Sequence, residues 1–219
     1  MPLQAAIFDL DGVIIDSSAF HFQAWQLLAQ ELGLPMTEAA FRETFGLPNR
    51  LILPKWLGRE LDEPEMQRLS SRKEALFRQI ARGRIQPLPG VMELIRALHE
   101  QGFRLAIASS TPRENRDMIA DDLGLWAYFP VILCGDEVQH GKPAPDIFLA
   151  AADRLGVPPP RCLVLEDAVG GVQAAKAAGM KCLAITTTQP RERLGQADRV
   201  VDSWEEVTVE QIKALLPNP

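Results

Sequence analysis

Short apolar segments alternate with helical patterns along most of the chain, and this alternation constrains the fold more than any other feature. Polar residues, glycines or prolines bound each segment, which is typical of buried strands. The predicted strands are 5–8, 105–108, 131–133, 162–165, 182–185 and 200–201. The predicted helices between the later strands are 91–101, 113–123, 147–155 and 171–178. Such alternation predicts an α/β fold of the Rossmann-like type, with a doubly wound parallel sheet.

Local signals support several helix boundaries. Residues 111–114, Thr-Pro-Arg-Glu, match a capping box with proline in the first helical position. Gly156 and Gly179 lie where helices are expected to end.

The segment after the first predicted strand interrupts the alternation. It contains no convincing strand, but helical patterns cover 20–32, 38–45 and 65–81. We therefore predict a catalytic core formed by 1–16 and 87–219 and an inserted helical cap over 17–86. Both ends of the insert return to the carboxyl end of the first strand, where ligands bind in open α/β sheets. We expect a lid over the site, and an extra subdomain with a purely structural role is the alternative.

Charge and composition exclude several classes of protein. The 219 residues carry a formal net charge of -6 and no run rich in Lys or Arg, so a nucleic-acid partner is not expected. The chain shows no secretory leader and no membrane span, and it is expected to be cytoplasmic, as a monomer or weak oligomer. The three cysteines, Cys134, Cys162 and Cys182, have no metal-ligand spacing and are expected to be buried, reduced thiols.

Two carboxylates follow the first predicted strand. Asp9 and Asp11 are separated by one residue and followed by Gly12, which allows a sharp turn. One carboxylate can attack phosphorus, and a second can protonate the leaving oxygen and later activate water. Calcium loops also begin with this pattern, but they need further acidic ligands, whereas apolar residues 13–15 follow here.

Hydroxyl groups and one lysine follow in order along the chain. Ser109 and Ser110 end the second predicted strand beside a helix start, where hydroxyls and free N–H groups can hold an anion. Prolines stiffen the backbone around Lys142, which precedes another predicted helix and could neutralise phosphate charge.

A second acidic pair, Glu166 and Asp167, ends a later buried strand. Placed beside Asp9 and Asp11 without compensation, these acids would repel one another strongly. A divalent cation resolves this conflict, and oxygen ligands together with a substrate phosphate indicate Mg2+.

These motifs together resemble the haloacid dehalogenase-like phosphohydrolase superfamily, in the branch with a helical cap that includes β-phosphoglucomutase. The resemblance covers nearly the whole chain. It implies that Asp9 is the phosphorylated nucleophile and that Asp11 is the general acid/base, with its backbone carbonyl on the metal. It implies that Ser109 holds phosphoryl oxygens and that Lys142 balances charge. Asp167, with Glu166 directly or through water, would complete the Mg2+ site next to Asp9. An acid at position 11 also separates the chain from the dehalogenases of the superfamily.

The resemblance extends to candidate substrate contacts, which include Gly12 and Ser110 in the core. His21 and Trp25 match cap residues that lie near the sugar in the mutase, although both could be ordinary helix residues. Lys73 aligns with a cap lysine that contacts the distal phosphate.

The chain departs from the mutase at the distal phosphate clamp. The arginine of the mutase aligns with Asn49, which leaves Arg50 one place late, and one residue turns a helical side chain by about 100°. Either Arg50 still reaches inward or the clamp is lost, and the departure favours a phosphatase.

Three functions remain open from the sequence. The first is Mg2+-dependent hydrolysis of a small phosphorylated metabolite, most simply a sugar phosphate, through an aspartyl phosphate. The second is a β-phosphoglucomutase that interconverts β-glucose 1-phosphate and glucose 6-phosphate. The third is a phospho-accepting signalling receiver module, which resembles a shorter domain without a helical insert.

Overall fold

The computed structural model describes residues 3–44 and 47–217. The chain divides into two compact units, one formed by Met1–Asp16 with Gln86–Pro219 and the other by Ser17–Ile85. Among the described residues, no helix combines the length and apolar character needed to cross a bilayer.

A six-stranded sheet in the order β3-β2-β1-β4-β5-β6 forms the centre of the first unit, and every neighbouring pair is parallel. The strands are β1 (Ala5–Phe8), β2 (Arg104–Ala108), β3 (Val131–Leu133), β4 (Cys162–Glu166), β5 (Lys181–Ile185) and β6 (Arg199–Val201). All four residues of β1 are fully buried, as expected for a central strand covered on both faces. The predicted doubly wound α/β fold is therefore confirmed.

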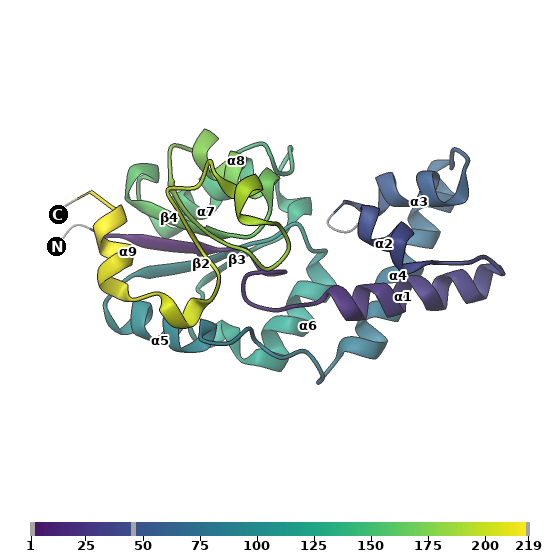
Figure 1. Ribbon diagram of the computed structural model, residues 1–219, viewed down its shortest axis with the longest axis horizontal. Helices are drawn as coiled ribbons and strands as arrows, with labels where there is room; N and C mark the ends of the chain where they lie inside the picture. The colour runs from purple at the N-terminus through teal and green to yellow at the C-terminus, as the bar shows by residue number, and fades with distance from the viewer. Residues whose placement is uncertain (1–2, 45–46, 218–219) are drawn as a thin grey trace. The chain divides into compact units, whose positions relative to one another are not determined.

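Helices cover both faces of this sheet, with α5 and α6 on one side and α7 and α8 on the other (Figure 1). The helices of the first unit are α5 (Val91–Glu100), α6 (Arg113–Leu123), α7 (Asp146–Leu155), α8 (Val169–Ala177) and α9 (Val209–Leu215). Short 3-10 turns occur at Leu125–Ala127, Gly135–Glu137, Pro159–Arg161, Arg191–Leu194 and Trp204–Glu206. Small apolar side chains of the strands, such as Ala106, Val164 and Ala184, pack against α7 and α8 in one continuous core.

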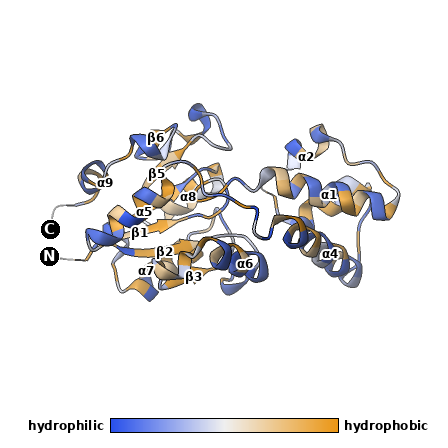
Figure 2. Ribbon diagram, turned by 90° about the horizontal axis from the view of Figure 1, so that it is seen from below, coloured by the Kyte–Doolittle hydropathy of each residue, from blue (hydrophilic) through white to orange (hydrophobic). Residues whose placement is uncertain are grey.

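Colouring by hydropathy separates the interior of this unit from its surface. The strands are largely hydrophobic, whereas the outer faces of the helices are hydrophilic (Figure 2). All three cysteines are buried and free, which confirms the expectation of reduced thiols.

The second unit is helical. It contains α1 (Ser18–Leu32), α2 (Glu38–Thr44), α3 (Asn49–Leu57) and α4 (Glu63–Ala81). Both α1 and α3 pack against α4. Asp62 caps α4, because its side chain accepts a hydrogen bond from the backbone N–H of Glu65 at 2.9 Å. The buried core of this helical unit includes Trp25, Leu28 and Phe77.

The structure corrects the sequence analysis at three helices. The sequence analysis misses α3, which contains Pro54, and α9, which begins after a capping box formed by Thr208 and Gln211. The predicted capping box at 111–114 is wrong, since Pro112 is the N-cap of α6 and makes no side-chain cap hydrogen bond. Phe45, the last residue of the predicted helical pattern 38–45, lies outside the described residues.

Candidate active site

The predicted core residues follow neighbouring strands at one edge of the sheet. The register pairs Phe8 of β1 with Ile107 of β2 and with Leu165 of β4. Asp9 and Glu166 come directly after these paired positions, and Ser109 follows Ile107 by two residues. The three side chains therefore start from the carboxyl edge of the sheet, where open α/β folds bind ligands.

Lys142 joins two of the predicted acids. Its Nζ donates to Oδ1 of Asp9 at 2.7 Å and to Oε1 of Glu166 at 2.5 Å. Nζ also lies 4.8 Å from the ring centroid of Phe148, which is fully buried. Burial acts to lower the pKa of Lys142, but the charges of Asp9 and Glu166 outweigh it and hold this pKa above its usual value. The lysine is therefore a fixed positive charge at the end of β1.

The acids around Lys142 carry more charge than one lysine can balance. Asp9 is only 7% exposed, and burial raises its pKa to about 7 despite the opposing charge of Lys142. Burial, followed by the charges of Glu166 and Asp9, raises the pKa of Asp167 well above its usual value. A bound cation would remove this repulsion.

The carboxylate of Glu166 is enclosed on all sides. Besides the hydrogen bond from Lys142, its Oε2 accepts from the backbone N–H groups of Asp167 at 2.8 Å and Ala168 at 2.9 Å. Gly171 of α8 makes room for it, because a Cβ at this position would lie 1.8 Å from Oε1. These contacts indicate that Glu166 anchors Lys142 and the turn after β4, and its contact with a metal, directly or through water, stays a prediction.

Asp167 lies against the turn after β1. Gly12 has φ +80°, and a Cβ on it would come within 2.1 Å of Oδ2 of Asp167. The position therefore requires glycine both for its backbone conformation and for the close approach of the carboxylate. This packing gives Gly12 a structural role; its predicted contact with the substrate stays a prediction.

Thr111, which the sequence predicts as part of a capping box, belongs to the site instead. Its hydroxyl donates to Oδ2 of Asp11, and its backbone N–H donates to Oγ of Ser109 at 3.1 Å. The hydroxyl is thus engaged by Asp11 and does not cap α6, which explains the failed capping box. Ser109 is buried and Ser110 is exposed at the same turn.

The donor chemistry fits Mg2+. Asp9 and Asp167 could supply carboxylate oxygens to such an ion, and the backbone carbonyl of Asp11 is expected to supply a third oxygen from its resemblance to the family. In residues 3–44 and 47–217, no three His, Cys, Asp or Glu side chains form a ready ligand cluster. Mg2+ usually takes one or two carboxylates and completes its shell with water and substrate phosphate.

A separate polar cluster lies inside the second unit. Lys73 is 3% exposed, and its Nζ lies 2.7 Å from Nδ1 of His21 and 2.9 Å from Oε1 of Glu74. Asn49 donates to the same oxygen of Glu74 at 2.7 Å. Nζ of Lys73 is also 5.7 Å from the centroid of Phe77, on which His21 stacks. Three predicted substrate contacts, His21, Lys73 and Asn49, therefore belong to one network.

Two other predicted cap residues are Trp25 and Arg50. Trp25 is 2% exposed and packs edge-on against Trp56, with ring centroids 5.8 Å apart, and its ring centroid lies 5.5 Å from Nζ of Lys73. Arg50 is exposed, one residue beyond Asn49 at the start of α3. Contact of either residue with a substrate stays a prediction.

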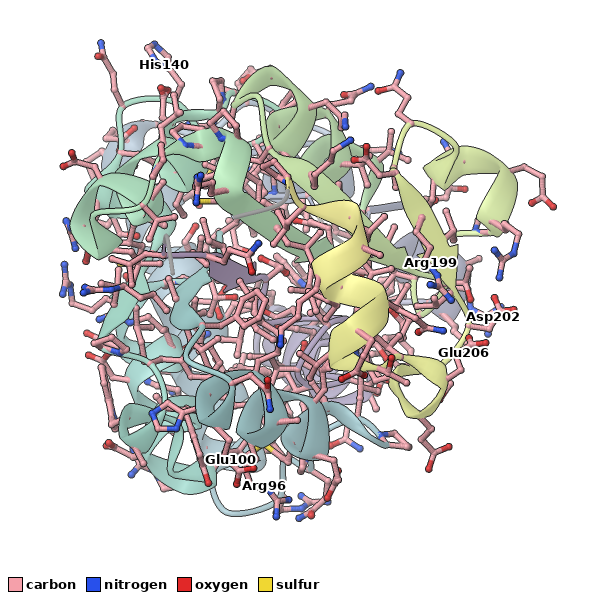
Figure 3. The ribbon with its side chains drawn as sticks, turned by 90° about the vertical axis from the view of Figure 1, so that its left-hand side faces the viewer. Arg96, Glu100, His140, Arg199, Asp202 and Glu206 are labelled. Carbon is pink, nitrogen blue, oxygen red and sulfur yellow. The ribbon has the colours of Figure 1, made fainter. Side chains whose placement is uncertain are left out.

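A group of charged residues lies on the surface of the first unit, near β6. Arg199, Asp202 and Glu206 lie together beside the end of β6 (Figure 3). Glu206 accepts from the backbone N–H groups of Asp202 at 2.7 Å and Ser203 at 3.0 Å, as part of a capping box. Glu206 therefore caps the 3-10 turn Trp204–Glu206.

Comparisons with known proteins identify the family of the chain. The family model of haloacid dehalogenase-like hydrolases matches residues 3–179. The chain is 34% identical over 183 residues to the phosphorylated carbohydrates phosphatase of Thermotoga maritima, covering 82% of this chain and 83% of that one. It is also 34% identical over 216 residues to the β-phosphoglucomutase of Bacillus subtilis, covering 95% and 93%.

A solved structure extends the likeness to the whole fold. The family IA haloacid dehalogenase-like hydrolase of Entamoeba histolytica superposes with a TM-score of 0.91 at 27% identity, covering 99% of this chain and 100% of that one. The chain belongs to the haloacid dehalogenase-like hydrolase family. It is an enzyme whose relatives include sugar phosphate phosphatases and a phosphoglucomutase, and the receiver-module alternative is set aside.

Proposed function

We propose that the chain is a Mg2+-dependent phosphatase that hydrolyses a small sugar phosphate through a phosphorylated Asp9. The observation that carries the proposal is the position of Lys142, whose Nζ joins Asp9 at 2.7 Å and Glu166 at 2.5 Å. Of the two carboxylate oxygens of Asp9, only Oδ1 accepts a hydrogen bond from a described residue. The other oxygen, Oδ2, is available to attack phosphorus.

The reaction has two balanced steps. In the first, the free oxygen of Asp9 bonds to phosphorus, the ester oxygen leaves, and Asp11 gives that oxygen a proton. In the second, Asp11 takes a proton from water, the water oxygen bonds to phosphorus, and the carboxylate of Asp9 is released with inorganic phosphate. Thr111 holds Asp11 by a hydrogen bond between the two side chains.

The remaining core residues bind and neutralise the phosphoryl group. Ser109 and the exposed Ser110, which follow β2, would donate hydrogen bonds to phosphoryl oxygens, and Lys142 would supply positive charge. Asp9, Asp167 and the carbonyl of Asp11 would hold Mg2+, which supplies further positive charge to the phosphate when bound.

We assign choice of substrate to the helical unit Ser17–Ile85, acting as a cap. Its network of His21, Lys73, Glu74 and Asn49 offers the polar groups that a sugar phosphate needs. Asn49 occupies the place of the mutase's phosphate-binding arginine and is already bound to Glu74, while Arg50 is exposed. This loss of a distal clamp favours hydrolysis over transfer to a second hydroxyl, and the mutase is the second candidate.

Phosphorus NMR separates these two candidates. The protein is mixed with Mg2+, β-glucose 1-phosphate and a trace of glucose 1,6-bisphosphate, with Asp9→Asn as the matched control. We expect inorganic phosphate from the wild type and no turnover from the variant. Glucose 6-phosphate as the main product would instead identify a mutase, and no turnover over a panel of sugar monophosphates would reject the proposal.

A further inference from the structure

Three consecutive threonines follow β5 and donate hydrogen bonds to three different parts of the first unit. The hydroxyl of Thr186 donates to Oδ1 of Asp202 at 2.7 Å, and that of Thr187 donates to the carbonyl of Gly12 at 2.5 Å. The hydroxyl of Thr188 donates to Oδ2 of Asp167 and also lies 3.2 Å from the carbonyl of that residue. No family motif used above includes these threonines.

The order of the strands makes these contacts informative. β5 neighbours β4 and β6, and β4 separates it from β1. To reach Gly12 in the turn after β1, the loop 186–188 must therefore pass the end of β4, where Asp167 lies. The loop ties together the two turns that would carry metal ligands on either side of the site.

The two oxygens of Asp167 are in different environments. Oδ2 accepts from Thr188 and is also the oxygen nearest Gly12, since a Cβ on Gly12 would lie 2.1 Å from Oδ2 and 3.0 Å from Oδ1. Among the described residues, no hydrogen bond to Oδ1 occurs. Asp167 can therefore offer Oδ1 to a cation while Oδ2 stays with Thr188.

Ligation through one oxygen or two distinguishes the common divalent cations. Mg2+ demands a compact octahedral shell, whereas Ca2+ takes six to eight oxygens and readily accepts both oxygens of a carboxylate. A carboxylate such as Asp167, with one oxygen hydrogen-bonded to Thr188, can bind a cation through its other oxygen only, which suits the compact shell of Mg2+. Mutation of a residue that hydrogen-bonds a metal ligand typically weakens metal binding by about 10- to 100-fold.

We propose that Thr188 is a positioning residue that makes Asp167 a one-oxygen ligand and so favours Mg2+ over Ca2+ at this site. The inference rests on the proposed function, because it requires a cation beside Asp9 and Asp167. It assigns cation preference to a hydroxyl outside the ligand set.

Equilibrium binding of metal alone tests this inference without turnover. Bound Mn2+ is followed by electron paramagnetic resonance and displaced by Mg2+ or by Ca2+ in wild type, Thr188→Val, Thr188→Ser and the matched control Thr186→Val. We expect Thr188→Val to bind Mg2+ about tenfold more weakly and Ca2+ with little change. Thr188→Ser keeps the hydroxyl and should retain the preference for Mg2+, as should Thr186→Val, whose hydroxyl bonds Asp202.

Each contrary outcome has a distinct meaning. An unchanged ratio of Mg2+ to Ca2+ affinity in Thr188→Val overturns the inference while the proposed function stands. A loss of preference in Thr188→Ser equal to that in Thr188→Val also overturns it, because the hydroxyl would then not be the cause. If the wild type binds neither Mn2+ nor Mg2+, both the inference and the proposed cation site fall.

Discussion

Nζ of Lys73 lies 2.7 Å from Nδ1 of His21 inside the helical unit. An ammonium group has no acceptor, so Nδ1 must accept this hydrogen bond and the ring proton must sit on Nε2. Burial, aided by the charge of Lys73, lowers the pKa of His21 well below its usual value. The cap network therefore contains a neutral histidine beside a charged lysine.

We predict that His21 stays neutral, with its proton on Nε2, at pH 6. Long-range proton–nitrogen NMR reads the tautomer directly, and His21→Asn identifies the signal among the three histidines. A ring that titrates near the ordinary histidine pKa of about 6.5 would contradict the assignment.

The same pKa shift predicts a pH dependence of stability. The unfolded chain takes up a proton at His21 below about pH 6.5, whereas the folded chain does not, so the free energy of unfolding falls as the pH drops below this value. His21 contributes a slope of at most about 1.4 kcal/mol per pH unit. Urea unfolding at pH 8 and pH 6 should show a smaller loss in His21→Asn than in wild type. Equal losses in the two proteins would show that His21 is not the group responsible.

Two adjacent glycines in α8 should respond oppositely to alanine. A Cβ on Gly171 would overlap the carboxylate of Glu166, whereas a Cβ on Gly170 meets nothing within 4 Å. We expect Gly171→Ala to destabilise the fold by about 1–3 kcal/mol and to reduce activity, because Glu166 must move away from Lys142. Gly170→Ala should be neutral or more stable by about 0.5–1 kcal/mol. Denaturant unfolding measures both, and a Gly171→Ala protein as stable and active as wild type would contradict the packing argument.

Removal of the Thr111 hydroxyl should slow catalysis. We expect Thr111→Val to lower kcat about tenfold with little change in KM, since Asp11 loses the hydrogen bond that orients it for proton transfer. Thr111→Ser keeps the donor and should remain close to wild type. Steady-state kinetics on the best sugar phosphate distinguishes them, and equal kcat values for valine and wild type would remove Thr111 from the mechanism.

The sheet could be predicted from sequence because its strands are apolar and separated by helical patterns. The same order places Asp9, Ser109 and Glu166 at one edge, since parallel strands end on the same side. The prolines around Lys142 indicate a fixed lysine, but the sequence does not predict that its Nζ donates to both Asp9 and Glu166.

Other features depend on side-chain directions that no spacing reveals. Thr111 could cap α6 or bind Asp11, and the pattern of residues 111–114 favours the first. The helix α3 was missed because Pro54 lies inside it, and prolines usually break helices. Thr188 follows a strand with no acidic motif, so its contact with Asp167 had no sequence signal.

The most direct test of the central claim is mass spectrometry of Asp9 after a rapid acid quench during turnover. The wild type, mixed with Mg2+ and a sugar phosphate that it hydrolyses, should carry a phosphoryl group on the peptide that contains Asp9. Asp9→Asn, folded and treated identically, should carry none. Efficient hydrolysis by folded Asp9→Asn, or a phosphoryl group trapped on a different residue, would contradict the account.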